Sequence, residues 1–182
     1  MTRIKKSCIC AICIALCYVL PVALHSFALG SVLSPMHIPV LLCGLVCGGF
    51  YGAFCGIAGP IVSSLLSGMP PVTMLFSMIP ELVAYGLICG VMMKRVRTGK
   101  LLPDVYIAQA TAMVLGRVVG GIAKALFITI MATGDAFSIG IWATGYFVTS
   151  LPGIALHLVL VPALVVVLMK ARVIPSRYSK TA

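Results

Sequence analysis

The 182 residues are 62% hydrophobic and only 9% charged, with a formal net charge of +10. Soluble domains carry roughly 25% charged residues, so this composition excludes a soluble globular protein. The apolar runs are continuous and do not alternate with polar residues, which excludes a β-barrel and predicts an all-α integral membrane protein.

Most of the basic residues gather in three short clusters beside apolar runs, which is the pattern of cytoplasmic loops. No basic soluble region remains that could bind a nucleic acid. The clusters are Arg3, Lys5 and Lys6; Lys94, Arg95, Arg97 and Lys100; and Lys170, Arg172, Arg177 and Lys180.

The first predicted span covers residues 8–29 and follows the first basic cluster. A signal peptide would begin in the same way, but this apolar stretch extends past Pro21 to Leu29 and is longer than a usual signal-peptide core. We therefore expect a retained helix with the N-terminus in the cytoplasm. The cysteines here and elsewhere lack the paired CxxC spacing of a zinc site, so we expect them to be packing residues.

The segment from His37 to Ser67 is long for one helix and short for two. Glycines recur every fourth residue from Gly44 to Gly56, which fits either one long helix with a packing stripe or a turn near Gly48 between two helices. With one helix, the second and third basic clusters would fall outside the cell. With two helices, all three clusters fall inside, so the charge pattern favours two.

This reasoning predicts six transmembrane helices in a single domain covering residues 1–182, with both termini in the cytoplasm. The two short helices should be buried beside longer ones or be partly re-entrant, because about 20 residues are needed to cross a bilayer. The expected spans cover about 8–29, 37–49, 51–67, 74–93, 104–131 and 144–169.

Ionisable residues inside the predicted spans are few and indicate a cavity or a buried pair. Glu81 and Tyr85 share one face of span 74–93, Arg117 and Lys124 share one face of span 104–131, and His157 lies in the last span. Two cations beside one carboxylate would suit an anionic ligand such as a carboxylate. The alternative is that Glu81 pairs with Arg117 or Lys124 and only fixes helix packing.

The predicted outer loops are rich in proline, which limits loop entropy and gives these segments a defined shape. His37 and Met69 lie in or beside them, and Trp142 lies near the outer end of the last span. We include all three among the candidate substrate-binding residues. No spacing of histidine and methionine supports a metal or haem site, so no metal is expected.

Several motifs of energy use and catalysis are missing from the sequence. There is no GxxxxGK[ST] phosphate loop, so the chain cannot use ATP by itself, and no HExxH or GxSxG motif of a hydrolase. Coupling to protons or sodium ions usually requires buried carboxylates, and Glu81 is the one carboxylate placed clearly inside a predicted span. The sequence therefore argues against ion coupling. A self-sufficient ion-coupled transporter or channel for a small anionic solute stays open as the alternative function.

Several segments resemble the substrate-binding S component of energy-coupling factor (ECF) vitamin transporters. The resemblance covers nearly the whole chain and rests on the order and spacing of the pieces. They are Ser34-Pro35-Met36-His37-Ile38-Pro39 with Tyr51-Gly52, Leu66-Ser67-Gly68-Met69-Pro70-Pro71, Glu81-Leu82-Val83-Ala84-Tyr85-Gly86, Leu115-Gly116-Arg117-Val118 and Leu151-Pro152-Gly153-Ile154.

The resemblance implies a six-helix subunit of the bacterial cell membrane that captures a micronutrient from outside. It implies as partners a transmembrane coupling protein and two ATPase subunits that supply the energy, so ATP is used by the partners and no cofactor is expected here. In this family the first span carries a small-xxx-small motif that docks on the coupling protein. Ala11 and Ala15 match that motif and share one helix face.

The family fold does not determine the ligand, because S components of one fold take up different vitamins. Arg117 and Lys124 favour a carboxylate, and the modest aromatic content of 8% argues against a large flat ring system. Pantothenate fits both observations and is the expected ligand, with folate and a haem- or cobalamin-type ligand as the next alternatives.

Overall fold

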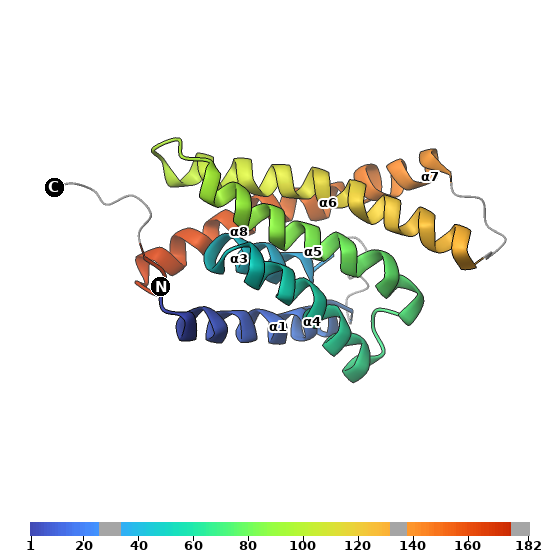
Figure 1. Cartoon of the computed structure of the whole chain (residues 1–182), viewed down its shortest axis with the longest axis horizontal. Coiled ribbons are helices and arrows are strands. Elements are labelled where there is room, and N and C mark those ends of the chain that lie inside the picture. The colour runs from blue at the N-terminus through green and yellow to red at the C-terminus, as the bar shows by residue number, and fades with distance from the viewer. Residues whose placement is uncertain (26–33, 132–137, 176–182) are drawn as a thin grey trace.

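The computed structural model describes residues 1–25, 34–131 and 138–175, and these form a bundle of helices running along a common long axis (Figure 1). The described residues contain no strand. The helices are α1 (Arg3–His25), α3 (His37–Cys47), α4 (Gly49–Ser67), α5 (Val72–Arg95), α6 (Leu101–Met131), α7 (Ile139–Ala143), the π-helical segment η1 (Thr144–Thr149) and α8 (Leu151–Lys170).

Five helices, α1, α4, α5, α6 and α8, have the length and hydropathy needed to cross a membrane, while α3 is apolar but has only 11 residues. Their outward faces are apolar, as a lipid environment requires: Leu65, Ile130 and Val159 are among the most exposed side chains. The bundle therefore has its polar side chains turned inward, where the candidate site lies.

The short helix α3 occupies the centre of the bundle. It contacts α1, α4, α5, α6 and α8, and all of its residues except Val46 are buried. An 11-residue helix extends only about 16 Å, so it cannot cross the bilayer core alone. Enclosure by longer helices removes that difficulty and places the first residue of α3, His37, inside the protein.

The segment from His37 to Ser67 is divided at Gly48, whose φ of 100° lies in a region that favours glycine. The glycines spaced four residues apart also allow the backbones of α3, α4 and α5 to approach one another closely. A Cβ on Gly44 would lie 2.5 Å from the carbonyl oxygen of Gly86, and one on Gly52 would lie 2.7 Å from Cα of Gly44. The glycines therefore both end α3 and pack α3, α4 and α5 together.

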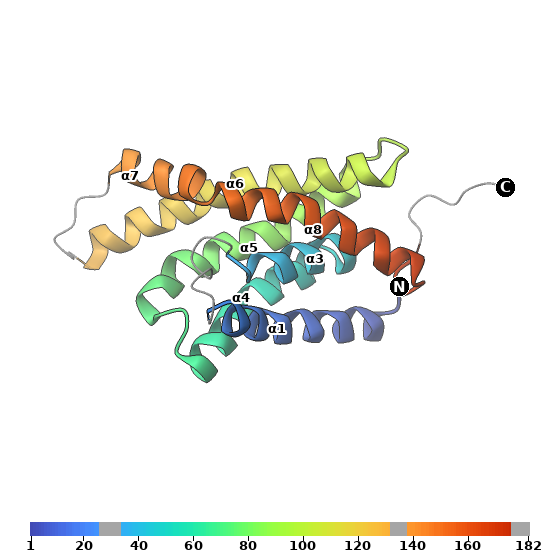
Figure 2. The same cartoon turned by 180° about the vertical axis from the view of Figure 1, so that it is seen from behind.

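The described residues of the three basic clusters lie at one end of the bundle (Figure 1). Cys47, beside the break, donates from Sγ to the Lys6 carbonyl oxygen at 3.6 Å, and the Lys94 side chain lies over Gly48. Figures 1 and 2 show the end of α8 and the α5–α6 connection at the same end. The opposite end carries the α4–α5 connection, the start of α3 and α7. Because two helices lie between residues 37 and 67, the chain crosses the bundle one more time and the basic α5–α6 connection lies at the same end as the N-terminus.

The last predicted span, 144–169, is not one continuous α-helix. Thr144–Thr149 forms a π-helical turn, and α8 begins after Ser150 with Pro152 in its first turn. Pro152 has no N–H to donate, and such a residue is tolerated in the first turn of a helix, which is where α8 begins. π-helical turns frequently occur at functional sites, and this one delivers Phe147 and Ser150 toward α6.

Candidate functional site

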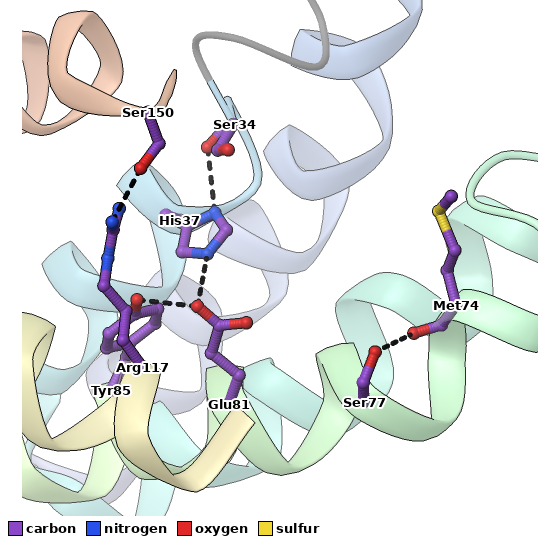
Figure 3. A network of polar contacts seen from close by, with 8 residues as sticks. All are labelled: Ser34, His37, Met74, Ser77, Glu81, Tyr85, Arg117 and Ser150. Atoms are coloured by element: carbon purple, nitrogen blue, oxygen red, sulfur yellow. Dashed lines mark hydrogen bonds and ion pairs between the residues drawn. The ribbon is translucent and has the colours of Figure 1, made fainter. Parts of the chain in front are cut away.

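The centre of the candidate site is Glu81, a buried carboxylate on α5. Its Oε1 atom accepts a hydrogen bond from the Tyr85 hydroxyl at 2.7 Å, and it lies 3.6 Å from Nε2 of His37 (Figure 3). Tyr85 is one turn along α5, so this contact follows directly from the spacing of four residues. The Tyr85 hydroxyl and the His37 ring thus lie on the same side of the carboxylate.

His37 joins α3 to this centre. Its Nδ1–H donates to the carbonyl oxygen of Ser34 at 3.0 Å, so each ring nitrogen faces an oxygen and the ring orientation is fixed. The ring packs edge-on against Tyr85 with centroids 5.0 Å apart, and stacks on His157 of α8 at 5.7 Å. Gln109 of α6 donates to the His157 carbonyl oxygen at 2.7 Å. Four helices therefore meet at one polar cluster.

Arg117 of α6 forms the cationic part of the site and is only 4% exposed. One terminal guanidinium nitrogen donates to Oγ of Ser150 at 2.6 Å, and the guanidinium carbon lies 5.6 Å from the centroid of Phe147, within cation–π range. Trp142 packs edge-on against Phe147 at 5.8 Å. The segment that precedes α8 therefore supplies a hydroxyl and one aromatic ring to the cation, and Trp142 packs on that ring.

Glycines on α6 make room for these side chains. A Cβ on Gly116 would lie 2.4 Å from the Tyr85 ring, one on Gly120 would lie 2.8 Å from Oε2 of Glu81, and one on Gly121 would lie 2.4 Å from the Trp142 ring. Any larger residue at these positions would displace a member of the site. The face of α6 that carries Arg117 is thus shaped around the site by small neighbours.

Six of the eight candidate binding residues come together in this region: His37, Glu81, Tyr85, Arg117, Trp142 and His157. The other two do not join them. Lys124 lies two turns further along α6 with an exposed side chain, and Met69 lies in the α4–α5 connection, also exposed.

The expected ion pair between Glu81 and either Arg117 or Lys124 is not formed. Among the described residues, neither cation lies within 4.0 Å of the Glu81 carboxylate, and His37 holds that place instead. The reason is geometric: α3 inserts His37 between the helices at the level of Glu81. Arg117 consequently has no carboxylate partner among the described residues.

Sequence reasoning missed Phe147, Ser150 and the glycines of α6 as parts of the site. Ser150 directly precedes Leu151-Pro152, and a hydroxyl residue before a helix-starting proline is a recognisable helix-start pattern. That pattern could have identified the end of a helix at this point. It could not have shown that the hydroxyl meets Arg117, which lies on another helix.

The proposed docking residues lie apart from this cluster. Ala11 and Ala15 are exposed on α1, whereas Cys10, Cys13 and Cys17 on the other face are buried against the bundle. Seven of the eight cysteines are buried and all eight are free thiols. Within the described part of the chain, no group of three or more His, Cys, Asp or Glu side chains is arranged to hold a metal ion.

Comparison with known proteins gives a family. Residues 5–165 match the family described as the ECF transporter, substrate-specific component. No curated protein and no solved structure matches the chain. The match covers every residue of the candidate site, and it agrees with the apolar multi-pass architecture. The chain therefore belongs to the family of substrate-specific components of ECF transporters and is a multi-pass membrane protein.

Proposed function

We propose that this protein captures a water-soluble vitamin or related micronutrient from outside a bacterial cell for ATP-driven uptake by its partner subunits. The observation that supports this most is the buried polar cluster of Glu81, His37, His157 and Arg117. Glu81 lies in the half of α5 away from the basic residue Lys94, and His37 begins α3, whose other end lies beside the basic end of the bundle. Basic clusters favour the cytoplasmic side, so the cluster belongs to the outer half, and both chain termini belong to the cytoplasm.

The proposed partners are a transmembrane coupling protein and two ATPase subunits. The family supports this assembly, and the chain itself has no phosphate loop with which to use ATP. We propose that Ala11 and Ala15 form the contact with the coupling protein. This proposal is supported by the exposure of both small side chains on α1. Small side chains allow two helix backbones to approach closely inside a membrane.

The proposed ligand is pantothenate. Arg117 is a buried cation without a carboxylate partner among the described residues, and a buried charge is costly unless a ligand or a neighbour compensates it. A carboxylic acid supplies that compensation. Folate and a haem- or cobalamin-type ligand are the other candidates. Lys124 and Met69 are outside the cluster, and we propose for Lys124 a weaker attraction of the acid from a distance.

Reconstitution distinguishes this function from self-sufficient transport. Vesicles that contain the chain with the coupling protein and both ATPases should accumulate labelled pantothenate only when ATP is inside, whereas vesicles with the chain alone should bind the compound without accumulating it. Uptake by the chain alone that follows a proton or sodium gradient, and that is lost in Glu81→Gln, would instead establish an ion-coupled transporter.

Arg117→Met is expected to weaken pantothenate binding at least tenfold, which corresponds to about 1.4 kcal/mol, because it removes a desolvated cation from the acid. Lys124→Gln should weaken binding about threefold or less, since its charge is exposed and screened. Isothermal titration of both purified variants measures the difference. Equal losses in the two variants would contradict the assignment of the acid to Arg117.

A further inference from the structure

The two charged groups of the site each have one polar atom that no described residue pairs with. On Glu81, Oε1 is held by Tyr85 and His37, whereas no described residue donates a hydrogen bond to Oε2. Figure 3 shows this second oxygen directed away from both partners. Oε2 lies beside Gly120, where a Cβ would approach to 2.8 Å.

Arg117 likewise has one unpaired donor among the described residues. Its Nε–H is buried and has no hydrogen-bond partner among the described residues, although a neighbouring guanidinium nitrogen donates to Ser150. A buried N–H left unpaired is unfavourable, and more so when the group is charged. Such a group is therefore expected to receive an acceptor when the site is filled.

The unpaired acceptor and the unpaired donor are neighbours. Gly120, which touches Oε2, is three residues after Arg117 on α6, and Gly116, which precedes Arg117, packs on Tyr85. The two groups are nevertheless more than 4.0 Å apart at their charged atoms, so they do not satisfy each other. A single small molecule can reach both.

Resting on the proposed capture function, we propose that the ligand is a monoacid that also carries a neutral hydrogen-bond donor: its acid group pairs with Arg117 and Ser150, and its hydroxyl or amide N–H donates to Oε2 of Glu81. This arrangement selects by two features at once. A compound without an acid leaves Arg117 uncompensated, and a second acid group placed at Glu81 meets a like charge.

The requirement for one acid group and one neutral donor distinguishes among the candidate vitamins. Pantothenate and biotin each carry one carboxylate together with hydroxyl or N–H donors, so they satisfy both groups. Riboflavin and thiamine carry no carboxylate, and folate carries two. The structure therefore favours the first pair and argues against folate, which composition alone left open.

The proposed chemical class of the ligand can be tested by ligand capture. The purified full-length chain in lipid nanodiscs is incubated with a bacterial extract supplemented with pantothenate, biotin, folate, riboflavin and thiamine, and the retained compounds are identified by mass spectrometry. Retention of a monoacid with a neutral donor supports the proposal. Retention of a compound without an acid, of a diacid or of a zwitterion overturns it while leaving the capture function intact. Retention of nothing contradicts both.

A second measurement tests which residue binds which group. The captured acid and its uncharged primary amide are titrated against three proteins. We expect the wild type to bind the acid at least thirtyfold more tightly than the amide, Arg117→Met to reduce this ratio to about threefold or less, and Glu81→Gln to weaken both compounds by a similar factor and keep the ratio. Ser150→Ala, a smaller change, should lower the ratio partway.

The opposite pattern, with the ratio lost in Glu81→Gln and kept in Arg117→Met, would overturn the assignment. Glu81→Gln preserves the shape of the side chain and its ability to accept from Tyr85, so it is the variant least disturbing to the fold at that position. If Arg117→Met does not fold, the ratio in Ser150→Ala decides: an unchanged acid preference contradicts the placement of the acid.

Discussion

Replacing both Ala11 and Ala15 with tryptophan is expected to abolish ATP-driven uptake while leaving ligand affinity at the wild-type value. Both alanines are exposed on α1, which lies at the edge of the bundle and contacts α3 and α4 with its opposite face. The large side chains therefore point away from the protein's own core. They would separate α1 from a partner helix by several ångströms and remove the close packing that small residues allow in lipid.

The comparison variant is Val159→Trp, which places the same side chain at an exposed position of α8, 69% accessible in the wild type. It should retain both uptake and binding. Uptake is measured in vesicles with the coupling protein and ATPases, and complex formation by copurification. Full uptake by the Ala11→Trp, Ala15→Trp variant would remove these residues from the docking contact.

The helical membrane architecture was predictable because it depends on local composition. Continuous apolar runs define helices regardless of their neighbours, and the charge pattern of the loops required a break between His37 and Ser67, which the structure has at Gly48. The polar residues of the site were also identifiable, because an ionisable side chain in an apolar span is costly and therefore rare.

Partnerships within the site were not predictable from the chain alone. Spacing of four residues gives the Glu81–Tyr85 contact, but the neighbour of Glu81 from outside α5 depends on how α3 inserts into the bundle. Arg117 meets Ser150, which is 33 residues away in the sequence, only because the π-helical turn redirects the chain before α8. Lys124 lies two turns after Arg117 on the same face of α6, but at that level the face is exposed, whereas at Arg117 it is buried.

Gly86→Ala is expected to lower stability by forcing α4 and α5 apart. A Cβ at Gly86 would lie 2.2 Å from the carbonyl carbon of Gly52 and 2.3 Å from its oxygen. Both are backbone atoms, so no rotamer change relieves the overlap and the helices must separate. Overpacking costs about 1–3 kcal/mol and sometimes more, which outweighs the gain of roughly 1 kcal/mol in helix propensity.

Separation of α4 from α5 would also move the helix that carries Glu81, five residues from Gly86, so ligand affinity should fall together with stability. The matched control is Gly145→Ala, where a Cβ meets no atom within 4 Å and the backbone needs no positive φ. Thermal unfolding in detergent should show a midpoint lowered by about 2–8 °C for Gly86→Ala and an unchanged midpoint for the control. Equal midpoints would show that the α4–α5 contact at Gly52 is not close, and with it the glycine packing that places Glu81 against α6 would be wrong.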